Sequence, residues 1–333
     1  MSTIANVFLD AGTLSPLNYR TATASQLSAQ HFDIDINALL KAAQPLKLYQ
    51  RSAPEQLIER AANAEIIISN KVYLSAEILA ELPQLRLICV AATGVNNVDL
   101  AAARKHQIAV CNVAGYSTDS VVQLTLQLIL QLNIGWTALQ HAMQNIGWEN
   151  HNEFVLLPRS FGQLRGKTLT IIGYGTIGKA VASVAKALGM TILIAQLPGR
   201  PARKDSVALA TALTQSDFVS LHCPLTEQTE HLVNSAFLAQ LKPNAILINT
   251  ARGGLIDEAA VARALNSGQL AGFGADVLSQ EPPAADNPLL TAANTIITPH
   301  IGWASMPARQ TLVDQIAANI QSFHQGELCN RIV

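Results

Sequence analysis

Short apolar runs alternate with helical patterns over nearly the whole chain. The runs that predict buried strands are Ile66–Ile68, Leu85–Val90, Ile108–Cys111, Thr168–Ile172, Ile192–Ala195, Phe218–Leu221, Ala245–Asn249 and Phe273–Val277. Helical patterns separate them at 75–81, 100–105, 177–188, 235–241 and 258–267. Strands that alternate with helices form βαβ units, and continuously apolar strands belong to sheets covered on both faces. The pattern predicts an α/β fold with two doubly wound parallel sheets, Rossmann-like or flavodoxin-like.

Two breaks interrupt this alternation. The first lies near 112–118 and precedes a long helix whose apolar residues recur at helical spacing from Val121 to Leu132. The second lies near 298–303 and precedes one amphipathic helix over 304–323, which we expect to pack back on the N-terminal domain. The predicted domains are a discontinuous one, residues 1–111 with 303–333, and a continuous one, residues 112–302.

Composition and charge exclude several classes of protein. Hydrophobic residues make up 49% of the 333 residues and charged residues 14%, which is typical of a compact globular protein. The net charge is −1 and no long run of Lys or Arg occurs, so nothing favours a nucleic-acid partner or an anionic membrane. The longest apolar stretch, 121–132, is too short and too polar to span a bilayer, and Met1–Asp10 has no basic region typical of a secretory signal.

The four cysteines give no sign of a metal site or a disulfide framework. Cys89, Cys111, Cys223 and Cys329 form no C-x-x-C pair and have no histidine at metal-ligand spacing. Because three of them lie in apolar, strand-like runs, we expect buried, reduced thiols in a cytoplasmic protein without a bound metal.

A glycine-rich turn follows the predicted strand at 168–172 and precedes a predicted helix. It reads Gly173-Tyr174-Gly175-Thr176-Ile177-Gly178. In this G-x-G-x-x-G pattern the first glycine makes the tight turn, the second lets the backbone approach a pyrophosphate, and the third lets the helix pack on the strand. The N-terminus of the helix offers N–H groups and partial positive charge to phosphates. The turn predicts a dinucleotide site; the alternative is an ordinary glycine-rich turn.

The end of the next strand bears on the choice of cofactor. An acidic residue that would bind the adenosine ribose is missing there, and Gln196 takes its place. Arg200 and Arg203 follow at once. A carboxylate would repel the 2′-phosphate of NADP, whereas a neutral glutamine with nearby arginines would accept it. The hypothesis is that NADPH is accepted; the alternative is that both arginines are solvated loop charges.

Three charged residues follow predicted strands in the second domain. They are Arg252 after 245–249, Glu281 after 273–277 and His300 after 295–297. Ligands of open α/β sheets bind at the carboxyl ends of strands, so the three side chains could converge on one crevice. Taken singly, each has an ordinary structural explanation: a salt-bridge arginine, a loop glutamate, and a surface or core histidine.

The reduction of a 2-keto acid needs such a set. A guanidinium can hold the carboxylate and polarise the carbonyl, and an imidazolium can protonate the alkoxide that forms as hydride arrives. A carboxylate beside the imidazole favours its protonated form. In the oxidative direction the neutral histidine would act as the base.

These residues resemble the D-isomer-specific 2-hydroxyacid dehydrogenase family over almost the whole chain. The motifs that carry the resemblance are Ala92-Thr93-Gly94-Val95-Asn96-Asn97-Val98-Asp99, the glycine turn, Leu221-His222-Cys223-Pro224-Leu225-Thr226, Asn249-Thr250-Ala251-Arg252-Gly253, Asp276 to Pro282, and Thr298-Pro299-His300. The segments Asn112–Thr118 and Gly302–Ser305 are most similar to one branch of this family. That branch comprises the glycerate dehydrogenases, which are also called hydroxypyruvate or glyoxylate reductases.

The resemblance implies the roles of the residues. Arg252, Glu281 and His300 would be the catalytic set, 112–302 the NAD(P)-binding domain, and 1–111 with 303–333 the substrate-binding domain, with an active-site cleft between them. The implied cofactor contacts are Gly173, Gly175, Thr176, Ile177, Gly178, Gln196, Arg200, Pro224, Thr229, Thr250, Ala251, Asp276 and His300, with Asp276 meeting the nicotinamide amide. The implied substrate contacts are Lys71, Thr93, Gly94, Val95, Arg252 and His300.

Other expectations also follow from the resemblance. The cofactor would be NAD(H) or NADP(H), the substrate a small 2-keto or 2-hydroxy acid, and the assembly a homodimer formed through the nucleotide domain. Trp148 would close the pocket, in some relatives from the neighbouring subunit, with core packing as the competing explanation. For Lys71 the alternative is a solvated loop lysine.

Alternative functions stay open at this point. The chain could be a reductase of broad specificity for 2-keto acids, or a nucleotide-sensing scaffold that resembles the corepressors related to this family. The peptide-docking surfaces and disordered tails of such scaffolds are not evident in the sequence. Glu281 at the position that pairs with His300 argues against formate dehydrogenase, which has glutamine there.

Overall fold

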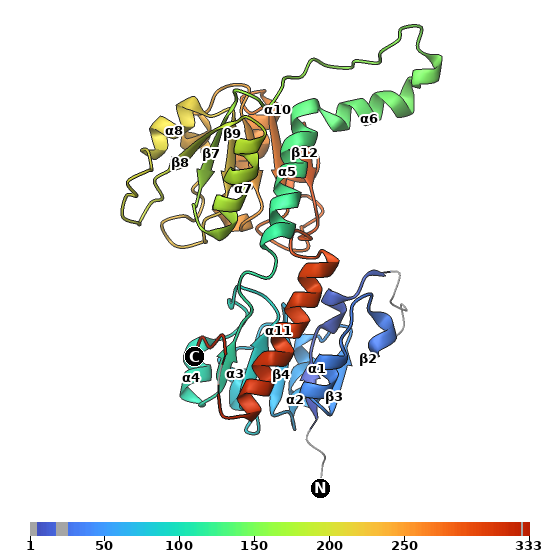
Figure 1. Ribbon diagram of the computed structural model, residues 1–333, viewed down its shortest axis with the longest axis vertical. Helices are drawn as coiled ribbons and strands as arrows, with labels where there is room; N and C mark the ends of the chain where they lie inside the picture. Colours follow the sequence, from blue (N-terminus) through green and yellow to red (C-terminus); the bar gives the residue numbers. More distant parts are fainter. Residues whose placement is uncertain (1–4, 18–25, 328) are drawn as a thin grey trace. The chain divides into compact units, whose positions relative to one another are not determined.

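The computed structural model describes residues 5–17, 26–327 and 329–333. The chain divides into two compact units, of which one comprises 1–117 with 304–333 and the other 118–303 (Figure 1). Each unit is built around its own six-stranded sheet. Within the described ranges, no helix has the length and apolar character needed to cross a membrane.

The sheet of the first unit is parallel except at one edge. Its strands are β1 (Asn6–Phe8), β2 (Gln26–Leu27), β3 (Leu46–Tyr49), β4 (Ile66–Ser69), β5 (Leu87–Val90) and β6 (Ala109–Cys111). They lie in the order β2-β3-β1-β4-β5-β6, and only β2 runs antiparallel to its neighbour. The five parallel strands therefore have the flavodoxin-like order 2-1-3-4-5, with the switch point between β1 and β4.

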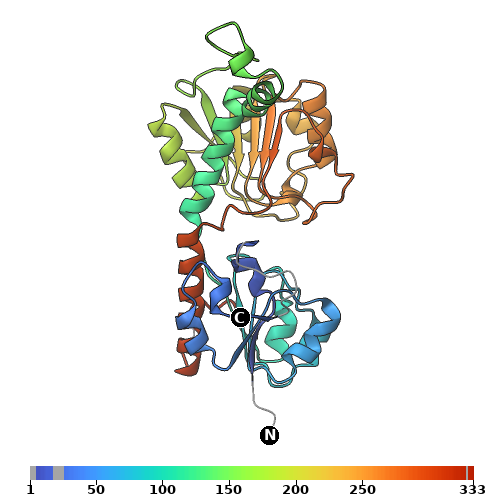
Figure 2. The ribbon, with the colours of Figure 1, turned by 90° about the vertical axis from the view of Figure 1, so that its right-hand side faces the viewer.

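Helices cover both faces of this sheet (Figure 2). They are α1 (Asn37–Ala42), α2 (Leu57–Ala61), α3 (Ala76–Ala80), α4 (Leu100–Lys105) and α11 (Met306–His324). One apolar cluster joins α2, α3 and α4 to the sheet, while α11 packs against α1 and β5. The buried Arg309 on α11 donates to the carboxylate of Asp33 at 2.6 and 2.8 Å and to the carbonyl of Leu14. These bonds fix the C-terminal helix to the N-terminal part of the chain, as expected.

The second sheet is parallel throughout. Its strands are β7 (Thr168–Ile172), β8 (Thr191–Ala195), β9 (Phe218–Leu221), β10 (Ile246–Asn249), β11 (Gly272–Ala275) and β12 (Thr295–Ile297). They lie in the order β12-β11-β10-β9-β7-β8. The order of the strands reverses at β7, with β8 on one side of it and β9 to β12 on the other. The crevice expected at a topological switch point therefore lies at the carboxyl ends of β7 and β9.

Two apolar clusters lie on opposite faces of the second sheet. One contains buried residues of α5 (Thr118–Ile134) and α7 (Thr176–Ala187). The other contains buried residues of α8 (Leu209–Gln215), α9 (Ser235–Leu238) and α10 (Glu258–Asn266). α5 ends at Gly135, whose φ of +70° breaks the helix, and α6 (Trp136–Asn145) follows.

The predicted strands and helices from residue 66 onward are confirmed to within a few residues. The sequence did not predict β1, β2, β3, α1, α2, α6 or α8. Strands β1 and β2 have three and two residues, and β3 carries Lys47, so none is a long apolar run. Cys89, Cys111 and Cys223 are buried free thiols, and Cys329 is exposed.

Candidate active site

The glycine turn lies between β7 and α7, and each glycine meets a different environment. A Cβ at Gly173, where φ is +100°, would lie 2.4 Å from the backbone nitrogen of Cys223. A Cβ at Gly178 would lie 2.2 Å from the carbonyl oxygen of Gly173. At Gly175 a Cβ would meet nothing within 4 Å. The first and third glycines are therefore needed for packing, while the second faces open space.

This arrangement fits a bound pyrophosphate. The first N–H groups of a helix have no partner within the helix, and Thr176, Ile177 and Gly178 form the first turn of α7 directly after Gly175. No acidic residue lies in that turn. Open space at the second glycine, unpaired N–H groups and the partial positive charge of α7 are the features that hold a dinucleotide.

A second loop borders this turn. Buried Thr229 donates its hydroxyl to the carbonyl of Pro224 and accepts from the N–H of Thr226, both at 2.8 Å. Thr229 therefore orders the loop that carries Pro224. Beside β10, the hydroxyl of Thr250 lies 3.0 Å from that of Thr125 on α5, and Ala251 donates its N–H to Asn249. That Pro224, Thr229, Thr250 and Ala251 contact a cofactor stays a prediction.

The polar side chains after β8 lie on the surface. Gln196 is exposed and its backbone N–H donates to Val207. Arg203 forms an ion pair with Asp205 at 3.0 Å and lies over the ring of Tyr174 in the glycine turn, 5.3 Å from its centroid. The guanidinium of Arg200 has no ion pair among the described residues. Arg200 is thus more available to an anion than Arg203.

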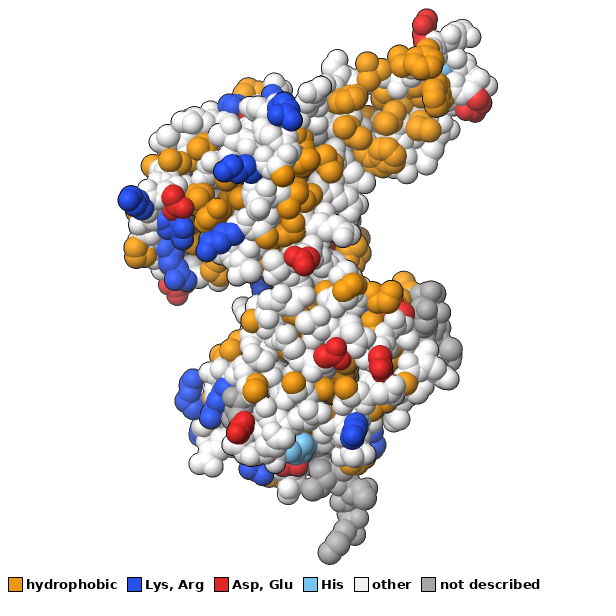
Figure 3. Space-filling view, in the orientation of Figure 1, with side chains coloured by type: hydrophobic (Ala, Val, Ile, Leu, Met, Phe, Trp, Pro, Cys, Tyr) orange, Lys and Arg blue, Asp and Glu red, His pale blue; other side chains and the backbone are white. Residues whose placement is uncertain are grey.

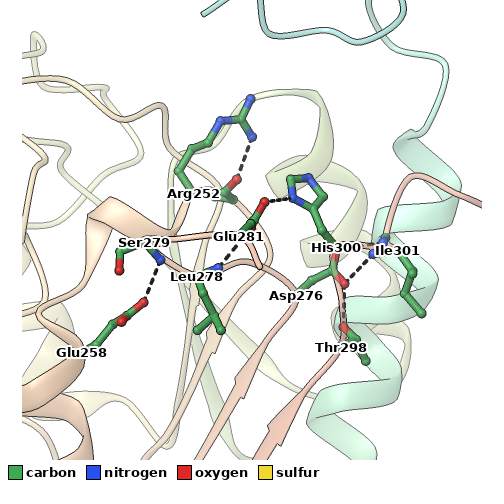
Figure 4. Close-up of polar contacts among 11 residues, drawn as sticks. Arg252, Glu258, Asp276, Leu278, Ser279, Glu281, Thr298, His300 and Ile301 are labelled. Carbon is green, nitrogen blue, oxygen red and sulfur yellow. Dashed lines mark hydrogen bonds and ion pairs between the residues drawn. The ribbon is translucent and has the colours of Figure 1, made fainter. Parts of the chain in front are cut away.

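Arg252, Glu281 and His300 extend from three adjacent strands (Figure 4). They follow β10, β11 and β12, which are neighbours in the sheet, and all three come from its carboxyl edge. The guanidinium of Arg252 is exposed and donates to the carbonyl of Ala251 at 2.7 Å. The sheet therefore brings together the charged residues that the sequence singled out in this unit.

The imidazole and the carboxylate form a direct pair. Nδ1 of His300 lies 2.6 Å from Oε2 of Glu281, while Oε1 of Glu281 accepts the N–H of Leu278 at 3.1 Å. Their side chains are 26% and 35% exposed, so water or a ligand can reach them. With Nδ1 engaged by Glu281, the other ring nitrogen, Nε2, is left for exchange of a proton.

Asp276 holds the loop that carries the histidine. Its buried carboxylate accepts the hydroxyl of Thr298 at 2.6 Å and the N–H groups of Ile301 and Gly302 at 2.9 and 2.7 Å. Burial raises the pKa of Asp276, and these donors lower it in part. His300 has a φ of +55°, which is uncommon for a residue with a side chain. The hydrogen bonds to Asp276 hold the backbone in this conformation. A contact of Asp276 with a nicotinamide stays a prediction.

Gly253 makes a close contact that the sequence pattern did not indicate. A Cβ there would lie 1.9 Å from the backbone carbon of Leu278. The loop of Arg252 can therefore touch the backbone of the loop of Glu281 only because residue 253 has no side chain. The same glycine stands in a quoted motif, but its spatial neighbour is 25 residues away in the sequence and is not visible there.

The first unit holds a second group of predicted residues. Lys71 follows β4, and Thr93, Gly94 and Val95 follow β5, the adjacent strand. The hydroxyl of Thr93 donates to the carbonyl of Val113 at 3.0 Å, and its own carbonyl accepts from Asn112. Lys71 and the loop of 93–95 thus lie at one edge of the sheet, where its strands have their carboxyl ends.

A buried carboxylate orders this edge, and no motif in the sequence pointed to it. Asp10, at the end of β1, accepts the N–H groups of Asn70, Lys71 and Val72 at 2.9, 2.6 and 3.3 Å. It is 4% exposed; burial raises its pKa, and the three donors lower it in part. β1 and β4 flank the switch point of the sheet, so Asp10 fixes the backbone of Lys71 at the place where such sheets bind ligands.

Two further expectations concern Trp148 and metals. Core packing is wrong as an explanation for Trp148, because the side chain is 54% exposed and its indole donates to the carbonyl of Phe154. Among the described residues, no cluster of three or more His, Cys, Asp or Glu side chains could hold a metal ion.

Comparison with known proteins gives the family. The sequence model described as the NAD binding domain of D-isomer specific 2-hydroxyacid dehydrogenase matches residues 126–302. A putative 2-hydroxyacid dehydrogenase of Haemophilus influenzae is 42% identical over 83% of this chain and 90% of its own length. A glycerate dehydrogenase of Methylorubrum extorquens is 41% identical over 82% of this chain and 87% of its own.

A solved structure has the same fold. The TT0316 protein of Thermus thermophilus has a TM-score of 0.83 and 30% identity, over 99% of this chain and all of that one. The glycine turn, the Glu281–His300 pair and Arg252 lie within the matched residues. The chain therefore belongs to the D-isomer specific 2-hydroxyacid dehydrogenases, a family of nicotinamide-dependent oxidoreductases that act on the CH–OH group.

Proposed function

We propose that this enzyme interconverts glyoxylate or hydroxypyruvate with the corresponding 2-hydroxy acid. The observation that carries the proposal is the 2.6 Å pair of His300 and Glu281, which follow β12 and β11, with Arg252 after β10 on the other side of β11. The glycerate dehydrogenase at 41% identity supports a small, hydroxylated substrate. When bound, the nicotinamide would exchange a hydride with the second carbon of the acid.

His300 would exchange the proton. Its Nδ1 is engaged by Glu281, so Nε2 would donate a proton to the alkoxide oxygen in the direction of reduction and accept it in the direction of oxidation. The bonds from Asp276 to Ile301 and Gly302 would keep the ring in position during both steps.

Cationic and N–H donors would hold the substrate. The exposed guanidinium of Arg252 would bind the carboxylate and polarise the carbonyl, for which its fork of donors is suited. The N–H groups of Thr93, Gly94 and Val95 would bind the carboxylate, and Lys71 would add positive charge. Asp10 acts here as a positioning residue, because it fixes the backbone of Lys71.

NADPH would be accepted as well as NADH. Gln196 brings no negative charge to the end of β8, and the guanidinium of Arg200 is exposed and has no ion pair in the described chain. A 2′-phosphate would therefore meet a cation rather than a carboxylate.

The enzyme would work as a homodimer formed through the nucleotide-binding unit. Exposed apolar side chains gather on α6 and the segment after it, shown in orange in Figure 3. They include Trp136, Met143, Trp148 and Phe154, which is 89% exposed. Apolar surface of this extent is typical of a surface that another chain covers.

A substrate panel tests the proposal. Oxidation of NADH and of NADPH would be followed with glyoxylate, hydroxypyruvate, pyruvate and phenylpyruvate. We expect the highest kcat/KM with glyoxylate or hydroxypyruvate, and turnover with NADPH. Normal binding of cofactor without turnover of any acid would favour a nucleotide-sensing scaffold, and preference for phenylpyruvate would favour a reductase of larger substrates.

A further inference from the structure

A cavity in the first unit lies away from Lys71 and the 93–95 loop. Its volume is about 340 Å³, and Arg86, Arg104, Gln107, Phe323 and Arg331 are among the residues that line it. Arg86 directly precedes β5, and Gln107 lies between α4 and β6, so the cavity lies at the amino ends of these two strands. Lys71 and the 93–95 loop follow β4 and β5 at the opposite, carboxyl edge.

Three chain segments build this cavity. Arg104 is in the last turn of α4, and Phe323 is near the end of α11. Arg331 is on the segment 330–333, which pairs with β6: Ile332 donates to Val110 at 2.8 Å and Asn112 to Asn330 at 3.2 Å. Because this pairing uses backbone bonds, the position of Arg331 does not depend on its side chain.

The lining is strongly cationic. Three guanidinium groups line the cavity and no acidic side chain does, although the whole chain has a net charge of only −1. Within the described part of the chain, the single ion pair of these arginines joins Arg86 to Glu65 at 3.4 Å, with 69% of the Arg86 side chain exposed. Figure 3 shows blue side chains gathered over this part of the unit, near the label of α4 in Figure 1.

The C-terminus of α4 offsets only part of this charge. Arg104 lies near the C-terminus of α4, where a helix carries roughly half a negative charge. Arg86 also lies over the ring of Phe323, 5.5 Å from its centroid, and this contact orients the guanidinium without neutralising it. Arg104 and Arg331 therefore form no ion pair among the described residues, while Val333, whose main-chain carboxylate ends the given sequence, also lines the cavity and offsets part of the positive charge.

We propose that this cavity binds a small polyanion with two or more phosphate or carboxylate groups. A guanidinium binds both groups through paired N–H donors, so three of them can hold several negative charges at once. The volume lies near the lower limit for small-molecule sites, roughly 300 Å³, so a tricarboxylate or a diphosphate group fits better than a whole dinucleotide. The site is independent of the proposed reaction.

Titration calorimetry of the intact protein tests this site. Citrate and inorganic pyrophosphate would be titrated separately, with cofactor in excess so that the glycine turn is occupied. We expect one polyanion per chain, and a Kd that rises with added salt because the contacts are between charges. Arg104→Gln and Arg331→Gln should each raise the Kd about tenfold, the loss of one charge-assisted pair. Tighter binding of one probe identifies the carboxylate or the phosphate as the natural group.

Arg51→Gln is the matched control, since Arg51 is another exposed arginine of the first unit and does not line the cavity. It should leave the Kd unchanged, and all three variants should keep the kcat/KM and Tm of the unsubstituted chain. Absence of binding by both probes would overturn the proposal. Binding that survives Arg104→Gln with Arg331→Gln but disappears in Lys71→Gln would also overturn it, because the polyanion would then occupy the catalytic edge.

Discussion

At the scale of single residues, the second unit uses its charged groups in two different ways. Asp276 is buried, and its carboxylate oxygens accept hydrogen bonds from Thr298, Ile301 and Gly302. Its negative charge therefore stabilises the loop that carries His300. Glu281 and His300 remain partly exposed and bind each other. The buried carboxylate of Asp276 therefore positions His300, and the partly exposed His300 and Glu281 are the groups that can exchange a proton.

The side chain of Arg252 is exposed as well, so its removal should lower kcat/KM and leave the thermal stability of the protein nearly unchanged. Among the described residues, the one hydrogen bond of its guanidinium is to the carbonyl of its neighbour Ala251. Arg252→Ala should lower kcat/KM by about a thousandfold, because both the carboxylate and the developing charge lose their donor. The Tm should change by less than about 2 °C. Arg252→Lys should recover only part of the rate, since an ammonium lacks the paired donors.

Steady-state kinetics with thermal melting of the same samples checks this expectation. A fall in Tm of several degrees with nearly unchanged kcat/KM would mean that Arg252 is structural.

At the scale of elements, the site depends on how closely two loops approach. A side chain at residue 253 would collide with the backbone of Leu278, three residues before Glu281. Gly253→Ala should therefore displace both Arg252 and Glu281 and lower kcat/KM by at least about a hundredfold. Crystal structures of the variant would show the displacement.

Gly254→Ala is the control for this substitution. Its Cβ would meet the side chain of Leu225, which is 40% exposed and can move. The control should keep most of the activity. Equal activity of the two variants would show that contact between the loops has no catalytic importance.

The loop after β9 gives a pH dependence of stability. Nε2 of His222 lies 2.9 Å from the hydroxyl of Ser220, while Nδ1 is buried and has no partner among the described residues. Burial lowers the pKa of His222 from its ordinary value of 6.5 to about 4. As pH falls through this window, the unfolded chain binds a proton that the folded chain does not. The free energy of unfolding should therefore fall, by about 2 kcal/mol between pH 7 and pH 5.

Urea unfolding at both pH values, with and without His222→Gln, measures this contribution. The substitution removes the titrating group, so the loss of stability on acidification should shrink by about that amount. An identical loss in both proteins would mean that His222 does not contribute.

Most of the second sheet could be predicted from the sequence, and less of the first. Strand β10 begins with three consecutive apolar residues, Ile246 to Ile248, because both of its faces are buried, and this pattern can be seen in the sequence. Strands as short as Asn6–Phe8 leave no such pattern, although the neighbouring Asp10 orders an edge of the sheet. The roles of Asp10 and Gly253 depend on residues distant in sequence, which periodicity and motifs do not reveal.

At the scale of the whole molecule, we expect two chains to cover the apolar surface of α6 and the following segment. Light scattering should give twice the mass of the 35.5 kDa chain. Substituting Phe154 and Val155, which are 89% and 56% exposed, by aspartate should yield monomers, since charges cannot be buried unpaired in an apolar interface.

Leu290→Asp is the control, because Leu290 is exposed in the same unit but lies outside this segment. It should remain dimeric. A monomeric unsubstituted chain at micromolar concentration, or a dimer that survives the double substitution, would contradict the proposed assembly.

The proposed reaction requires His300, held by Glu281, to exchange a proton with the substrate. The most direct measurement is kcat for hydroxypyruvate reduction by His300→Gln and Glu281→Gln, with cofactor affinity measured on the same samples. We expect a kcat lower by about a thousandfold for His300→Gln and about a hundredfold for Glu281→Gln, with cofactor Kd nearly unchanged. A kcat within about tenfold of the unsubstituted enzyme in His300→Gln would contradict it.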